Sequence, residues 1–183
     1  MIMPGMPSSR PSTLRMKGPD AYNEYVELSY NLKDMDLDDI EHGILRGNRS
    51  PPYNLFRALV DGDPRLTHTI EPMDPRIHFA LVRASSSCPP IDVYTAENIG
   101  EELNISGRTF LNAGGMHIDR KHRLVLLSRI FKWYGNDFGE SDADRIRFIA
   151  PYLYNEMDTE FLMENAGDPG IEYQSYDWRL NRG

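Results

Sequence analysis

Near the middle of the chain stand Asp74-Pro75-Arg76-Ile77-His78-Phe79-Ala80-Leu81-Val82, followed shortly by Ser87-Cys88-Pro89-Pro90. This stretch holds a long apolar run, a histidine and, ten residues after the histidine, the only cysteine of the chain. The segment 77–82 is nearly all apolar, which predicts a strand that is covered on both faces. We therefore expect the rest of the domain to pack around it.

Composition restricts the class of protein. The chain has 183 residues, enough for one domain with a proper core. Twenty Lys and Arg stand against 28 Asp and Glu, which gives a net charge of −8. A protein that binds a nucleic-acid backbone needs a basic face, so this balance argues against nucleic-acid binding. A single cysteine excludes an internal disulfide and a Cys-rich zinc site.

The ends and the apolar runs predict location and domain limits. No apolar run approaches the roughly 20 residues of a membrane span, and the Pro-rich start lacks the apolar segment of a signal peptide. We expect a soluble, cytoplasmic protein that does not bind membranes. Residues 1–19 are interpreted as a disordered lead, or as a start inside a longer natural domain, and residues 20–183 as a single α+β domain.

In the first half of the chain, residues 22–30 are rich in Tyr, Val and Leu and predict a strand. A helix is expected from an Asp36 cap to Arg46, because apolar residues recur there at helical spacing. Gly47 and Asn48 should end this helix. A short helix is expected over residues 54–60, and a longer one over residues 96–111 with Thr95 as its cap.

The second half begins with Gly114 and Gly115, which should end the long helix. Residues 116–119 and 124–127 read as a hairpin around a basic turn. Ser128 and Ser141 are expected to cap two helices, the second ending near Pro151. A last helix over 157–166 and a strand over 171–176 complete an α+β fold, with a mixed or antiparallel sheet, a central hairpin and several short packed helices.

Four pieces of sequence together carry a family resemblance. They are Leu37-Asp38-Asp39-Ile40-Glu41-His42-Gly43-Ile44-Leu45-Arg46, the central stretch with its Ser-Cys-Pro-Pro, Ile130-Phe131-Lys132-Trp133-Tyr134 with Asp137-Phe138, and Tyr176-Asp177-Trp178 with Leu180-Asn181. In order and spacing the chain resembles the domain of unknown function 547 family from about residue 22 to residue 181. The resemblance implies no biochemical activity, because the family's is unassigned. Members usually carry an N-terminal helical part, which has no counterpart in this sequence.

His78 and Cys88 are the first candidates for chemistry. A cysteine nucleophile needs a base or a cationic neighbour, because only its thiolate reacts. His42, on the predicted helix beside Glu41, is a second candidate base. Against this, papain-like and transglutaminase-like enzymes place the cysteine before the histidine and at the start of a helix, whereas here Cys88 follows His78 and precedes Pro89. The alternative interpretation is that Cys88 is a small buried core residue.

A metal site is the weaker interpretation of the same residues. His42, His78 and Cys88 could together bind zinc, but no pair has the short spacing of a recognisable zinc site. Neither a metal nor a cofactor is predicted. Asp74 and Asp137 are expected to form turns or caps, although either could orient a histidine.

Three hypotheses follow. The first is a domain with a pocket lined by His42, Arg46, Arg76, His78 and Cys88, which binds a small anionic or peptide-like ligand. The second is a Cys/His-dependent hydrolase or acyltransferase with Cys88 as nucleophile, His78 as base and Asp74 or Glu41 as the orienting carboxylate. The third is a protein-interaction module whose exposed core is covered by a protein partner or a second copy. The predicted catalytic residues are thus Cys88, His78, His42 and Glu41, and the predicted ligand-binding residues are Arg46, Arg76 and Asp74.

Overall fold

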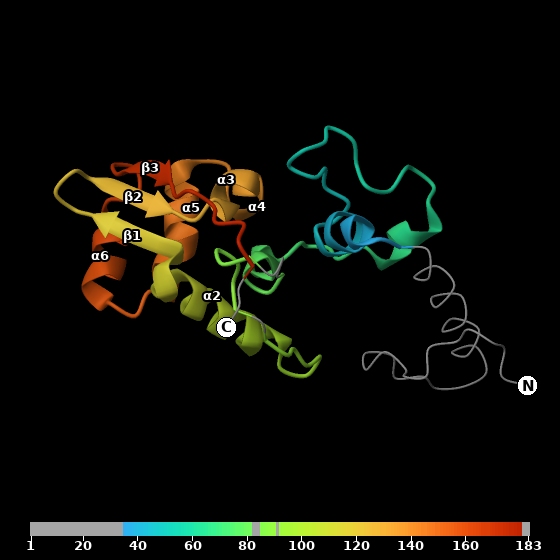
Figure 1. Cartoon of the computed structure of the whole chain (residues 1–183), viewed down its shortest axis with the longest axis horizontal. Coiled ribbons are helices and arrows are strands. Elements are labelled where there is room, and N and C mark those ends of the chain that lie inside the picture. Colours follow the sequence, from blue (N-terminus) through green and yellow to red (C-terminus); the bar gives the residue numbers. More distant parts are fainter. Residues whose placement is uncertain (1–34, 82–84, 91, 181–183) are drawn as a thin grey trace, which may run out of the picture. The chain divides into compact units, whose positions relative to one another are not determined.

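A computed structural model of the protein describes residues 35–81, 85–90 and 92–180 (Figure 1). The chain divides into two compact units, Met1–Asp74 and Pro75–Gly183, and each is described by itself below. The predicted strand over residues 22–30 and the predicted disordered lead lie outside the described residues. The single domain expected from residue 20 stays a prediction.

The first unit is built on a helix of π type, η1 (Asp39–Leu45). The Asp36 carboxylate accepts a hydrogen bond from the Asp39 amide at 2.8 Å, and the helix gives way to Gly47 and Asn48, both with positive φ. The predicted helix and its two end signals are confirmed. The short helix expected over residues 54–60 is wrong. The Asn48 side chain instead holds the backbone N–H and C=O of buried Leu59, each at 3.0 Å.

A 3₁₀ helix, η2 (Pro64–His68), follows in the same unit. Asp63 caps it by accepting from the Arg65 amide at 2.9 Å, and the Asp63 carboxylate also accepts from the Arg65 guanidinium at 3.0 and 2.7 Å. The guanidinium donates in addition to Asp39 at 2.8 Å. Arg65 therefore ties η2 to η1. These bonds lower the pKa of Asp63 to about 2, first through the side-chain bond with Arg65.

The Asp63–Arg65 pair predicts a loss of stability in acid. Because the pKa of Asp63 is lower in the folded chain than the value of about 3.9 in an unfolded one, its contribution is present above about pH 4 and is lost as the pH falls towards 2. We expect the Asp63 carboxyl carbon to titrate near pH 2 in an NMR experiment. We also expect Asp63→Asn to flatten the fall in the urea midpoint between pH 4 and 2. A titration midpoint near 4 would show that the pair does not hold in solution.

The second unit begins with a 3₁₀ helix, η3 (Pro75–Phe79), where the sequence predicted a strand. That prediction is wrong. Pro75 has a fixed φ and no N–H, which suits the first position of a helix. The amides of Ala80 and Leu81 both donate to the Ile77 carbonyl at 2.9 Å. Of the apolar residues of the run that the structure describes, Phe79 is fully buried and Ile77, Ala80 and Leu81 are half-buried.

A three-stranded sheet follows, and its order is β1-β2-β3 (Figure 1). Strands β1 (Met116–Asp119) and β2 (Leu124–Leu127) form the predicted hairpin, with Met116 opposite Leu127. Strand β3 (Gly170–Tyr173) lies parallel to β2, with Val125 opposite Ile171. The α+β class with a mixed sheet and a central hairpin is confirmed.

Helices, most of them short, come before the sheet in the chain and between strands β2 and β3. Those after the long helix α2 (Ile99–Phe110) are η4 (Leu111–Gly115), α3 (Ile130–Trp133), α4 (Gly135–Phe138), α5 (Asp142–Ile149), η5 (Ala150–Tyr152) and α6 (Glu156–Glu164). The cap predicted at Ser141 is confirmed, since Ser141 and Asp144 form a reciprocal capping box. The cap predicted at Thr95 is wrong: helix α2 starts after Asn98, and Thr95 donates to the Glu102 carboxylate instead.

The core of the second unit is centred on Phe79. The centroid of its ring lies 5.7 to 6.5 Å from the centroids of five other aromatic rings, those of Phe110, Phe131, Phe138, Phe148 and Tyr152. Val125 and Leu127 of β2 and Ile146 and Ile149 of α5 complete the same buried cluster. Within the second unit the central stretch thus contributes the centre of the core, through one side chain of a helix rather than through a strand.

Candidate functional site

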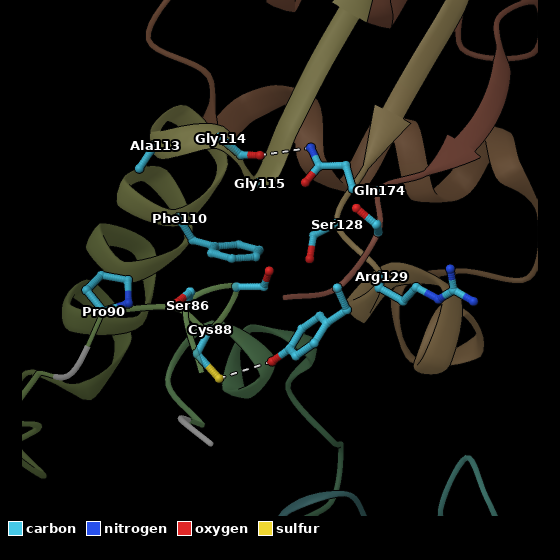
Figure 2. Close-up of a pocket in the computed structure, with 13 residues that line it drawn as sticks. Ser86, Cys88, Pro90, Phe110, Ala113, Gly114, Gly115, Ser128, Arg129 and Gln174 are labelled. Carbon is cyan, nitrogen blue, oxygen red and sulfur yellow. Dashed lines mark hydrogen bonds between the residues drawn. The ribbon is translucent and has the colours of Figure 1, made fainter. Parts of the chain in front are cut away.

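The second unit contains a pocket of about 220 Å³ at one end of the strands of its sheet (Figure 2). Strand β1 begins at this end of the sheet, and strands β2 and β3 finish there, because β3 runs parallel to β2 and β1 runs antiparallel to β2. Four segments that lie far apart in the sequence therefore meet around the pocket. The lining residues are Ser86, Ser87, Cys88, Pro90, Phe110, Ala113, Gly114, Gly115, Ser128, Arg129, Gln174, Ser175 and Tyr176.

Backbone geometry at two glycines shapes one wall of the pocket. Gly114 has a φ of +114°, a conformation that favours glycine. A Cβ on Gly115 would lie 2.7 Å from the Phe110 carbonyl oxygen, which is too close for a side chain. The Gln174 amide donates to the Gly114 carbonyl at 2.9 Å, as Figure 2 shows, and so joins this wall to the segment after β3.

Cys88 lies on the pocket wall among hydroxyl groups. Its Sγ is 3.1 Å from the Tyr176 hydroxyl, and Ser85 Oγ is within donating distance of both groups, at 3.3 Å from Sγ and 2.8 Å from Oη. The Cys88 amide donates to the Ser85 carbonyl at 3.0 Å, which closes a turn and turns the thiol towards Tyr176 (Figure 2). Cys88 is half-buried. The Cys88 sulfur therefore lies within hydrogen-bonding distance of two hydroxyl groups.

The charge of the lining differs from that of the whole protein. Among the lining residues Arg129 is the one charged side chain, and none is acidic, although the chain as a whole carries −8. The other polar groups are hydroxyls, the Gln174 amide and the backbone of Gly114 and Gly115. Arg129 is half-buried at the point where β2 leads into α3. The Arg129 side chain runs away from Phe110 and Ser128 (Figure 2), so the groups gathered around the pocket are neutral hydrogen-bonding groups and the ring of Phe110.

His78 lies in a buried pair with Asp137. Its Nε2 is 2.8 Å from Asp137 Oδ2, and the two side chains are only 1% and 2% exposed. Its ring stacks on Tyr134 with centroids 4.1 Å apart and lies 5.3 Å from Phe138. An ionised carboxylate can only accept, so the ring nitrogen that faces Asp137, Nε2, carries a proton. Asp137 is thus a carboxylate bonded to this histidine.

His42 and Arg46 lie in the first unit and are both buried. Arg46 Nη1 is 2.8 Å from His42 Nδ1, and because a guanidinium can only donate, Nδ1 accepts and the proton of the neutral ring is on Nε2. His42 Nε2 lies 3.9 Å from carboxylate oxygens of Asp38 and Glu41. In this tautomer His42 offers no lone pair to a thiol, which counts against its predicted role as a base.

The structure divides the predicted site residues between the two units. Glu41, His42, Arg46 and Asp74 belong to the first, and Arg76, His78 and Cys88 to the second. Arg76 Nη1 donates to the Gly100 carbonyl at 2.8 Å and to Asn104 Oδ1 at 2.7 Å, which ties η3 to α2. Of the predicted residues, Cys88 is the one among the described residues that lines the pocket. The catalytic and ligand-binding assignments stay predictions.

Sequence reasoning did not find Ser128, Arg129, Gln174 and Tyr176 as neighbours of Cys88. Their position in the sequence could have indicated that they lie near each other, because Ser128 and Arg129 come directly after one strand and Gln174 to Tyr176 come directly after another. Among the residues that the structure describes, no three His, Cys, Asp or Glu side chains lie close enough to hold a metal ion. Within the same residues, no helix has the length and apolar character that crossing a membrane requires.

Comparison with known proteins identifies the family. A family model described as "Protein of unknown function, DUF547" matches residues 20–111. Neither the curated proteins nor the solved structures gave a match. The matched segment is half of the chain and contains η1, η3, Cys88 and α2, whereas Arg129 and Tyr176 lie beyond it. The chain belongs to the DUF547 family of proteins of unknown function.

Proposed function

We propose that this protein binds a small anionic or peptide-like ligand in the pocket beside Cys88. The observation that carries the proposal is the charge of the lining, which has Arg129 and no acidic residue in a chain of net charge −8. A ligand whose carboxylate extends past the other lining groups to the Arg129 guanidinium would pair with it through two parallel hydrogen bonds. Gln174, Ser128 and the glycine backbone supply donors and acceptors for an amide group.

The size of the pocket limits the ligand. A cavity of about 150 Å³ holds a benzene molecule, so a pocket of about 220 Å³ suits a ligand between an amino acid and a dipeptide in size. The pocket has few apolar side chains, among them Phe110 and Pro90. Its specificity would thus come from its polar groups, which fix the orientation of the ligand.

Replacing Arg129 by glutamine is expected to weaken carboxylate binding about 10- to 150-fold, because a hydrogen bond to a charged group contributes about 1.5–3 kcal/mol. The measurement is isothermal titration calorimetry with N-acetylated amino acids against the full chain. The same compounds as C-terminal amides should bind weakly to the unaltered protein. Arg108→Gln, at an exposed position of α2, is the matched control and should change nothing.

The result that would overturn this proposal is equal affinity for acids and amides in the unaltered protein, or an Arg108→Gln effect as large as that of Arg129→Gln. An absence of binding by every carboxylate tested, with a normal urea unfolding curve, would also overturn it.

A Cys/His-dependent hydrolase or acyltransferase is the second candidate, favoured by the presence of Cys88 among the residues that line the pocket. In this mechanism the Cys88 thiolate would attack an acyl carbon of the bound ligand and form a thioester, while the bond to the leaving group breaks and the leaving group takes the proton back from the histidine. Water, or an acceptor in a transferase, would then release the acyl group from Cys88. His78 would take up the thiol proton, and Asp137 would hold the ring through Nε2. The proposal retains the predicted nucleophile and base and replaces the predicted orienting carboxylate.

Labelling of Cys88 tests this candidate. We expect iodoacetamide to react with the native protein with a midpoint below about pH 8.5, the value of an unperturbed cysteine. Tyr176→Phe should raise the midpoint, because it removes a donor to the thiolate. His78→Ala should slow labelling at pH 7 if His78 is the base. No labelling before unfolding would make Cys88 a core residue and remove this candidate, while leaving ligand binding open to its own test.

A further inference from the structure

Ser128 and Gln174 lie next to each other on the wall of the pocket, directly after strands β2 and β3. Leu127 and Tyr173 are partners in the parallel ladder of these strands, so the next residue on each side is Ser128 and Gln174. The Gln174 backbone N–H donates to the Leu127 carbonyl at 2.8 Å. Since neighbouring strands are about 4.7–4.9 Å apart and both residues line the pocket, one small ligand group can meet both side chains.

The side chain of Ser128 offers the pocket a hydrogen-bond donor. Ser128 is only 4% exposed, and its hydroxyl lies on the side of Phe110 (Figure 2). The hydroxyl oxygen accepts from the Ile130 backbone N–H at a long 3.4 Å, whereas the O–H donates to no group in the part of the chain that the structure describes. A buried donor without an acceptor is costly, so a ligand that brings an acceptor is favoured here.

The side-chain amide of Gln174 offers an acceptor beside this donor. Its Nε2 donates to the Gly114 carbonyl at 2.9 Å. Because a carbonyl oxygen can only accept, this bond fixes which end of the amide is the nitrogen. Oε1 therefore points away from Gly114 and towards Ser128 (Figure 2). Within residues 35–81, 85–90 and 92–180, no group donates to Oε1.

A purely structural role explains one hydrogen bond of each side chain. The bond from Gln174 Nε2 joins η4 to the segment after β3, and the bond to Ser128 Oγ holds the start of α3. It does not explain why the donor of Ser128 and the acceptor of Gln174 remain side by side on the same pocket.

The pair selects among the polar groups that a ligand can present. A primary carboxamide has a carbonyl oxygen and an N–H on the same side, so it can accept from the serine and donate to the glutamine. A carboxylate has two acceptors and no donor. A trans peptide group points its C=O and its N–H in opposite directions. Neither of these two groups can bond to both side chains at once.

We propose that the ligand of the pocket carries a primary carboxamide, whose C=O accepts from the Ser128 hydroxyl and whose N–H donates to Gln174 Oε1. This inference rests on the proposed function for the place of the ligand and adds the group that the pocket recognises. It does not depend on the Arg129 guanidinium. Two sources have this chemistry: a small derivative of asparagine or glutamine, and an asparagine or glutamine residue of a peptide.

The experiment compares N-acetyl-asparagine with N-acetyl-leucine and N-acetyl-aspartate on the full chain by isothermal titration calorimetry. The three side chains have nearly the same shape, and the carboxamide alone has both an acceptor and a donor. We expect N-acetyl-asparagine to bind about 5- to 150-fold more tightly than N-acetyl-leucine, the change that two neutral hydrogen bonds produce. N-acetyl-glutamine against N-acetyl-glutamate repeats the comparison with a longer side chain.

Two variants test the two bonds separately. Ser128→Ala removes the donor and Gln174→Met removes the acceptor, and each should reduce the preference for the carboxamide over leucine to about one bond's worth, roughly 2- to 12-fold. Thr159→Ala is the control, because it removes a hydroxyl that is bonded to the Ala150 carbonyl and does not line the pocket. It should leave the preference unchanged. Urea unfolding confirms that each variant is folded.

The outcomes separate this inference from the proposed function. Equal affinity for N-acetyl-asparagine and N-acetyl-leucine, with the same result for the glutamine pair and with both affinities lowered by Arg129→Gln, would overturn the carboxamide and leave the proposed function standing. A carboxamide preference that persists while Arg129→Gln has no effect would support the carboxamide and overturn the carboxylate pairing. No binding of any of these compounds would overturn both.

A peptide distinguishes the two sources once the preference is shown. If acetyl-Gly-Gly-Asn binds at least as tightly as N-acetyl-asparagine, the carboxamide belongs to a peptide. If the peptide binds at least tenfold more weakly, the ligand is a small derivative of the amino acid.

Discussion

Replacing Phe79 by alanine is expected to destabilise the second unit by about 3–5 kcal/mol, the usual cost of removing a fully buried phenylalanine. The ring is 0% exposed and lies among five other aromatic rings. The substitution would leave a cavity that these rigid neighbours cannot fill by small shifts. Since a domain of this size is stable by only about 5–15 kcal/mol, the variant should unfold at a much lower urea concentration.

Urea unfolding followed by the emission of Trp133 and Trp178 measures this effect, because both tryptophans lie in the second unit. Phe79→Leu keeps part of the volume and should lose less, so it remains measurable if Phe79→Ala does not fold. Phe56→Ala, at a side chain that is largely exposed, should stay within about 0.5 kcal/mol. A loss below about 1 kcal/mol for Phe79→Ala would show that the aromatic core does not depend on this ring.

Phe79 also shows why the sequence predicts that the central stretch is buried but does not predict its secondary structure. A short apolar run can be a buried strand or a buried helical turn, and periodicity cannot separate the two. Asp74-Pro75 before the run was the signal for a helix start, because proline is favoured at the first helical position. We interpreted the pair as a turn, and the structure places η3 directly after it.

Elements with local signals were predicted well. The hairpin of β1 and β2, the end of η1 at Gly47 and the Ser141 cap each depend on residues that are close in sequence. The parallel pairing of β2 with β3 joins residues 124–127 to residues 170–173, and nothing local in either strand specifies it. The walls of the pocket depend on that pairing.

Only part of the candidate site could be predicted from the sequence, because its residues also come together through long-range strand pairing. Cys88 could be singled out because it is the only cysteine. Its neighbour Tyr176 is 88 residues away along the chain, and Arg129 is among the lining residues because β2 and β3 end on the same side of the sheet. A residue type can be recognised in a sequence, whereas a set of neighbours from four segments depends on strand order.

Asp137→Ala is expected to destabilise the protein by about 3–5 kcal/mol, because removing one partner leaves the other polar group of a buried pair without its bond. His78 and Asp137 are almost fully buried and 2.8 Å apart. Asp137→Asn keeps an oxygen that can accept from Nε2 but removes the charge, so its expected loss is smaller, about 1–2 kcal/mol. Asp137→Ala is expected to lose more stability than Asp137→Asn because only the alanine variant loses the hydrogen bond to Nε2. The smaller loss of stability in Asp137→Asn is the part that comes from the charge.

Urea unfolding gives these losses, with Asp142→Ala as the control. Asp142 also pairs with a basic group, Arg145, but its side chain is largely exposed, so its loss should stay within about 1 kcal/mol. Nitrogen-15 shifts of the His78 ring supply a second readout that a stability change alone would not move. Asp137→Asn should keep the proton on Nε2, and Asp137→Ala should let the two tautomers mix. If Asp137→Ala keeps a single tautomer and loses less than 1 kcal/mol, Asp137 does not orient His78, and the mechanism that uses His78 as the base loses its orienting carboxylate.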